Sequence, residues 1–203
     1  MEEESGSVVY SKNAIEFVTV ASEYCKMIES IDKMPALIFL SQAQKILPLL
    51  YLKASLIPYF DQVLDEPVEK IFSESDWSYI QMKITAKLEN FEWYFDYQDP
   101  FSMVENDIMQ ISVSEVFTDI YQDLSDLIHL YQLGNEEIMN DALWECKNAF
   151  ENYWGKRLIG LMEQIHIALY SDIPGKTDER FEKKDTDNWL ISKRMKDLRG
   201  DDV

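Results

Sequence analysis

The chain has 203 residues, of which 46% are apolar and 28% are charged, and its formal net charge is −19. This apolar content is high enough to offset the entropy cost of folding, so a fully disordered chain is excluded. A chain this negative is also poorly suited to nonspecific binding of nucleic acids or anionic membranes, because both require a positive surface.

The first half of the chain spaces its apolar residues as helices do. A first helix is predicted over residues 11–30, with Ser11 as its N-cap. A second, over residues 35–57, is apolar on nearly all sides, which predicts a position at the centre of a bundle. Residues 58–72 are predicted to connect it to a third helix over residues 75–90.

Residues 91–111 combine six aromatic rings with several carboxylates, and Pro100 would interrupt a helix. We predict an irregular aromatic loop. Aromatic rings beside carboxylates can cage a cation such as a quaternary ammonium or an arginine, which makes residues 91–104 a candidate cation site. The alternative is that the rings cover one end of the bundle.

The second half predicts two long antiparallel helices. The first begins with a capping box formed by Ser112 and Glu115 and ends before Gly134. The second is expected to run unbroken over residues 135–170. Gly155 and Gly160 lie inside it, where glycine weakens a helix, so we expect a neighbouring helix to approach closely there.

The predicted fold is therefore all-α, a bundle of about five main helices. We divide the chain into a flexible start (residues 1–10), one helical domain (11–170) and a charged tail (171–203) with a possible short helix at 188–198. The acidic start is unlike a signal peptide, and no stretch resembles a membrane span. Cys25 and Cys146 are too few for a disulfide framework, so a cytoplasmic location is expected.

Acidic residues repeat at four-residue spacing on the two long helices. Between Leu88 and Gly155 there are 15 acidic residues and one basic residue, Lys147. Like charges at this spacing destabilise a helix, so the pattern suggests a purpose other than stability. One interpretation is a solvated face, another is loose binding of divalent cations, and a third is a surface for a basic protein partner, formed by Glu115, Asp119, Asp123, Asp126, Glu137, Asp141 and Glu145.

Both histidines follow a carboxylate by three residues, as Asp126 with His129 and Glu163 with His166. Such pairs build di-metal sites in helical bundles when they face inward. Here Asp126 and His129 are predicted to point away from the apolar stripe of their helix. A metal-binding enzyme is therefore the alternative hypothesis, and chance spacing on solvated faces is the main interpretation.

No sequence motif points to catalysis. The chain has no G-x-G-x-x-G, no Walker A loop and no G-x-S-x-G elbow, so we expect no nucleotide cofactor and no hydrolase serine. The leading hypothesis is a non-enzymatic interaction or adaptor protein without a cofactor.

Four segments carry a family resemblance: NAIEFVTVASEYCKMIE (13–29), ILPLLYLKA (46–54), DIYQDLSDLI (119–128) and YWGKRLIGLMEQIH (153–166). With them, residues 10–170 resemble an uncharacterised Bacteroides-type family of about 200 residues, a domain of unknown function. The resemblance implies an all-helical cytosolic protein, and it carries over no catalytic residue.

Overall fold

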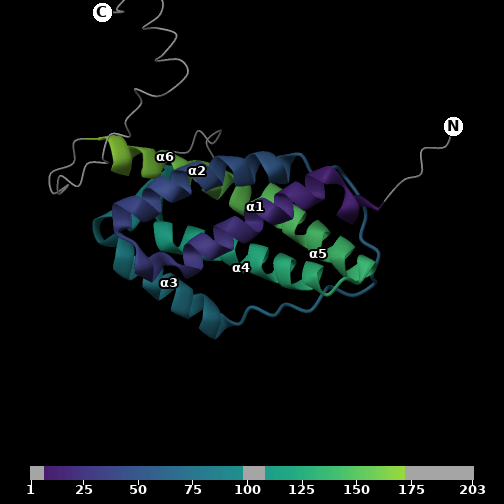
Figure 1. The fold of residues 1–203 in the computed structure, drawn as a ribbon. Coiled ribbons are helices and arrows are strands. Elements are labelled where there is room, and N and C mark those ends of the chain that lie inside the picture. Colours follow the sequence, from purple (N-terminus) through teal and green to yellow (C-terminus); the bar gives the residue numbers. More distant parts are fainter. Residues whose placement is uncertain (1–6, 98–107, 172–203) are drawn as a thin grey trace, which may run out of the picture. The chain divides into compact units, whose positions relative to one another are not determined.

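A computed structural model describes residues 7–97 and 108–171. Its helices are α1 (Lys12–Glu29), α2 (Ala36–Ser55), α3 (Glu74–Leu88), α4 (Val113–Gln132), α5 (Glu136–Ala149) and α6 (Gly155–Tyr170) (Figure 1). Short 3-10 turns span Val8–Tyr10, Ile31–Lys33 and Glu89–Phe91. The predicted short helix at 188–198, the rest of the tail after Ser171 and residues 1–6 of the predicted flexible start lie outside the described residues.

The predicted all-helical bundle is confirmed, and its helices begin where the sequence places N-caps. The Ser11 hydroxyl accepts a hydrogen bond from the Ala14 backbone N–H, and Ser112 accepts one from Glu115. Ser73 and Asp76 form a complete capping box at the start of α3. None of the described helices combines the length and apolarity that a membrane crossing requires.

The central helix is α4, which packs against α1, α3, α5 and α6. By contrast, α2 lies at the edge of the bundle, between α1 and α6 (Figure 1). The prediction that residues 35–57 occupy the centre is therefore wrong. Leu47 and Leu50 of α2 are fully buried, but Leu49 and Leu52 on its other side are about half exposed. Helix α2 has an apolar face with no partner in the described part of the chain.

Residues 136–170 are helical throughout, as predicted, but a π-helical turn over Phe150–Trp154 joins α5 to α6. A Cβ on Gly155 would lie 2.5 Å from the carbonyl oxygen of Phe150. Gly155 therefore makes room for the π turn itself, not for a neighbouring helix. At Gly160 the close neighbour is the Tyr94 hydroxyl, 3.2 Å from an added Cβ, so a strand and not a helix approaches there.

Residues 93–97 and 108–112 of the aromatic segment are the two strands of a β-hairpin, which corrects the prediction of an irregular loop for these residues. Strands β1 (Trp93–Tyr97) and β2 (Ile108–Ser112) pair antiparallel, with Tyr94 opposite Ile111. Side chains alternate along a strand, so Trp93 and Phe95 are exposed while Tyr94 is buried. The carboxylate of Glu92 accepts hydrogen bonds from the hydroxyls of Ser112 and Ser114, which ties the hairpin to the start of α4.

Candidate interaction site between α4 and α5

The connection between α2 and α3 crosses the acidic sides of α4 and α5, and we call its residues 58–73 the strap. Asp141 of α5 is fully buried and accepts hydrogen bonds from the backbone N–H groups of Val63 (2.7 Å) and Leu64 (2.9 Å). Asp126 of α4 accepts from those of Ile71 (3.0 Å) and Phe72 (2.9 Å). The strap forms no helix or strand, so these backbone N–H groups have no partner in a regular element. The two carboxylates accept their hydrogen bonds instead.

The acidic ladders therefore do not form one solvated face. Asp126, which was predicted to point away from the buried stripe, is only 7% exposed. Asp119 accepts from the Trp77 indole N–H (2.9 Å) and from the Tyr153 hydroxyl (2.5 Å), so it is engaged as well. Glu115, Asp123 and Glu145 are half-buried, and only Glu137 of the seven predicted partner-binding residues is exposed.

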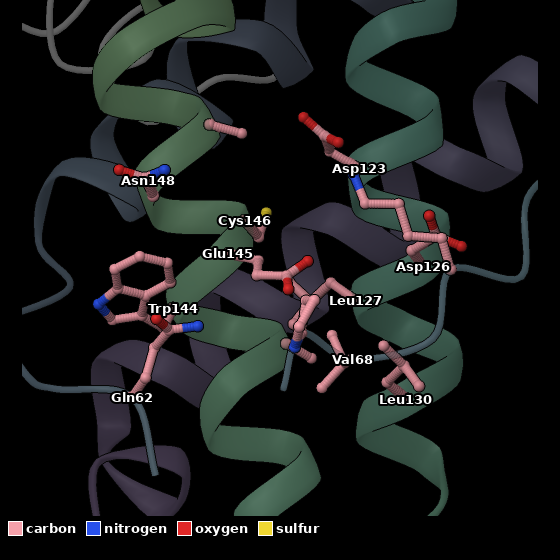
Figure 2. Close-up of a pocket in the computed structure, with 14 residues that line it drawn as sticks. Gln62, Val68, Asp123, Asp126, Leu127, Leu130, Trp144, Glu145, Cys146 and Asn148 are labelled. Carbon is pink, nitrogen blue, oxygen red and sulfur yellow. The ribbon is translucent and has the colours of Figure 1, made fainter. Parts of the chain in front are cut away.

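Between its two anchors the strap covers a cavity of about 420 Å³. Asp123 of α4 and Glu145 of α5 line it from opposite sides, and both carboxylates reach into the space between the helices (Figure 2). Asp126 also lines the cavity, but its carboxylate lies toward the strap, from which it accepts two backbone hydrogen bonds (Figure 2). Leu127 and Leu130 add an apolar wall, and we call this cavity the acidic pocket.

Burial in the acidic pocket disfavours the charged form of both carboxylates. It raises the pKa of Asp123 to about 6, an effect that the nearby Lys70 charge reduces and the neighbouring carboxylates increase. Burial likewise raises the pKa of Glu145, although Lys70 and a hydrogen bond from the Val68 backbone N–H act in the opposite direction. Lys70 itself is exposed. The pocket thus holds two carboxylates that a further positive charge would stabilise.

A second cavity, of about 560 Å³, adjoins the acidic pocket where Val68 and Leu130 line both. Leu133 and Ile138 form its apolar floor, and we call it the apolar pocket. Its rim is acidic, with Asp65, Glu66 and Glu69 all exposed on the strap. The two pockets together offer a site for a cation next to a site for an apolar side chain.

The four candidate metal ligands are not brought together. Asp126 is occupied by the strap, His129 is exposed on α4, and Glu163 and His166 are exposed on α6. Glu163 and His166 line a groove against α2. Among residues 7–97 and 108–171, no three histidine, cysteine or acidic side chains are arranged to hold a metal ion.

The two cysteines lie in the interior of the protein. Cys25 and Cys146 are both buried and unpaired, and burial raises the pKa of each thiol, which makes them poor nucleophiles.

In the candidate cation cage at residues 91–104, the exposed rings Trp93 and Phe95 share one side of β1. Residues 98–104 of that candidate lie outside the described part of the chain.

The sequence does not predict the strap contacts, because they are nonlocal. Asp141 lies 78 residues from Val63, and Asp126 lies 55 residues from Ile71. A signal was present: carboxylates at four-residue spacing without basic partners are unfavourable on a helix unless something else compensates them. Backbone N–H groups of a distant segment provide that compensation.

The family comparison agrees with this architecture. A family model described as a domain of unknown function, DUF5063, matches residues 8–171. The chain belongs to this family. Among solved structures, protein BF1032 from Bacteroides fragilis is 35% identical to this chain in sequence, with a TM-score of 0.73. The match covers 83% of this chain and 99% of that one. Among curated proteins no relative matches. The predicted resemblance of residues 10–170 to a Bacteroides-type family of unknown function is thereby confirmed.

Proposed function

We propose that this protein is a non-enzymatic interaction module whose acidic pocket receives a basic side chain of a partner protein. The observation that carries the proposal is the pair Asp123 and Glu145, two partly dehydrated carboxylates that face each other across an open cavity. A guanidinium or ammonium group placed between them would restore the charge stabilisation that burial removes.

The apolar pocket narrows the class of partner. A lysine or arginine in the acidic pocket would bring a neighbouring side chain over Leu133 and Ile138, so an exposed segment with adjacent basic and apolar residues fits best. The exposed acids of the strap and the net charge of −19 would accelerate the encounter at low salt. Of the acidic face predicted from the sequence, the proposed site includes Asp123 and Glu145. It excludes Asp126 and Asp141, because both accept hydrogen bonds from the strap.

A photo-crosslinking experiment tests this proposal. Asn148 is exposed and lines the acidic pocket, so a photoreactive amino acid placed there should capture whatever enters. We expect crosslinks to basic segments of a specific protein, lost at high salt. They should also be lost in the double variant Asp123→Asn/Glu145→Gln.

The matched control is Glu74→Gln/Glu163→Gln, which removes the same two charges from exposed positions on α3 and α6. It should leave the crosslinks unchanged. Capture of the same segments by the pocket variant and the wild type would contradict the proposal.

A further inference from the structure

The outward face of α2 carries an unusually regular stripe. Every member is exposed, and the steps alternate between four and three residues: Ile38, Gln42, Lys45, Leu49, Leu52 and Leu56. Four of the six are large aliphatic residues with 40–50% of their surface in contact with water. A helix at the edge of a bundle normally carries polar residues on such a face. Alternating four- and three-residue spacing is instead the pattern by which one helix packs along another.

Helix α6 extends this apolar surface. Ile159 and Tyr170 are exposed at 53% and 65%, and the Tyr170 hydroxyl donates to the Gln44 side chain of α2. A groove of about 460 Å³ runs between the two helices, lined mainly by apolar side chains that include Pro48, Tyr51 and Met162. We call the stripe and these α6 residues the α2–α6 face.

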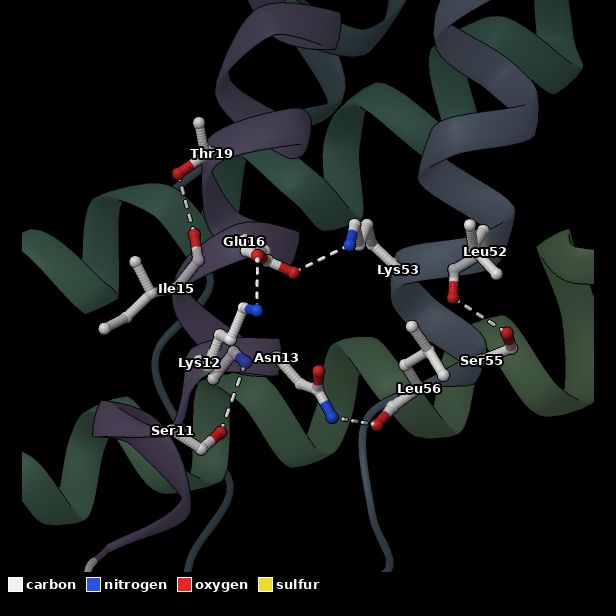
Figure 3. Close-up of polar contacts among 11 residues, drawn as sticks. Ser11, Lys12, Asn13, Ile15, Glu16, Thr19, Leu52, Lys53, Ser55 and Leu56 are labelled. Carbon is white, nitrogen blue, oxygen red and sulfur yellow. Dashed lines mark hydrogen bonds and ion pairs between the residues drawn. The ribbon is translucent and has the colours of Figure 1, made fainter.

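The charge distribution indicates what covers the α2–α6 face. Helix α2 has two lysines and no acidic residue, although the whole chain has 38 acidic residues. Lys53 is paired with Glu16 of α1 at 2.7 Å, and Asn13 of α1 donates to the Leu56 carbonyl (Figure 3). Two copies of so acidic a chain repel each other over most of their surface. The α2–α6 face lets them meet without bringing acidic helices together.

The area of this face also suits a second copy. A standard interface buries about 800 Å² on each partner, of which somewhat more than half is apolar. The six exposed apolar side chains of the face (Ile38, Leu49, Leu52, Leu56, Ile159 and Tyr170) offer roughly 600 Å². This amount matches what one partner of a stable dimer supplies.

We propose that the protein forms a homodimer in which the α2 helices of two copies pack antiparallel along this stripe. With the two-fold axis near residue 47, Lys45 lies opposite Leu49 of the second copy and Ile38 lies opposite Leu56. A parallel arrangement would place the two Lys45 ammonium groups together. Lys45 therefore selects the antiparallel pairing, as single polar residues do in helix pairs. The dimer leaves the acidic pocket on α4 and α5 free, so this inference is independent of the proposed function.

The first test is the mass of the full chain in solution by light scattering. We expect twice the 23.9 kDa of one chain for the wild type and a monomer for Leu49→Glu/Leu52→Glu. The matched control is Met82→Glu, since Met82 is 60% exposed on α3, away from the stripe. It should remain a dimer. A monomeric wild type, or a dimeric Leu49→Glu/Leu52→Glu, overturns the proposal.

A second measurement decides the matter if the double variant fails to fold. The same axis places Gln42 opposite Leu52 of the second copy, so the double variant Gln42→Cys/Leu52→Cys should form disulfides between two copies under mild oxidation, whereas Met82→Cys should not. The native Cys25 and Cys146 are buried and do not compete. A wild-type dimer in which Gln42→Cys/Leu52→Cys fails to crosslink uses another surface or register, and the proposal is then wrong.

Discussion

Two faces of the helical bundle differ in which side chains they bury: one buries carboxylates, and the other leaves leucines exposed. In the groove between α4 and α5, Asp126 and Asp141 are buried, and the strap covers them. On the outer side of α2, Leu49 and Leu52 are about half exposed. The difference shows that burial follows from the available partners, because a carboxylate is tolerated inside when backbone N–H groups reach it. An apolar stripe stays outside when the bundle has no further helix to cover it.

The largest effect is expected from breaking the strap anchor on α5. Asp141→Ala leaves the backbone N–H groups of Val63 and Leu64 without their acceptor and should lower the free energy of unfolding by about 2–4 kcal/mol. Urea denaturation measures the change. Glu137→Ala, on the same helix but exposed, is the control and should change it by less than about 0.5 kcal/mol. Equal effects of the two substitutions would mean that Asp141 does not hold the strap.

An effect of opposite sign is expected at Asp123. Its pKa is raised from 3.8 to about 6, so between these values the folded chain holds a proton that the unfolded chain releases. This group therefore lowers stability as pH rises through that window, and its full cost is present above about pH 6. Asp123→Asn removes this cost and should stabilise the fold by about 1–3 kcal/mol at neutral pH.

Thermal and urea unfolding across the pH range check the Asp123 prediction. The gain should shrink as the pH falls below 6 and vanish below about pH 4, where the aspartate is protonated in both states. Glu74→Gln, at an exposed site, should show no such pH dependence. A gain that is the same at every pH would show that burial of the ionised carboxylate is not its cause.

The smallest effect within one chain is expected on the outer side of α2. Leu49→Ala should cost less than about 1 kcal/mol in dilute protein, because half of the side chain already contacts water. Leu47→Ala, two residues away but fully buried, should cost about 2–5 kcal/mol. Thermal unfolding at two protein concentrations sharpens the comparison, since only a dimer contact at Leu49 makes its cost grow with concentration.

Local chemistry was enough to predict the helices. Ser11 and Ser112 cap α1 and α4 as expected, and the apolar stripe of α4, with Phe117 and Leu124, is buried. These features depend on residues within one or two turns of each other, so the sequence determines them directly. The π turn at Phe150–Trp154 and the hairpin were missed, because Gly155 and the aromatic residues 93–97 fit other local structures equally well.

Only the tertiary structure decided which helix is central and which carboxylates are free. The composition of α2 is compatible either with a central position or with an exposed apolar stripe. Because α2 packs between α1 and α6 at the edge of the bundle, its stripe is exposed. The spacing of Asp119, Asp123 and Asp126 places them on one side of α4, but it does not show that the strap and Tyr153 occupy two of them. The periodicity of a sequence predicts which side of its own helix a residue lies on. It does not predict which group the residue contacts, because that group belongs to a segment tens of residues away.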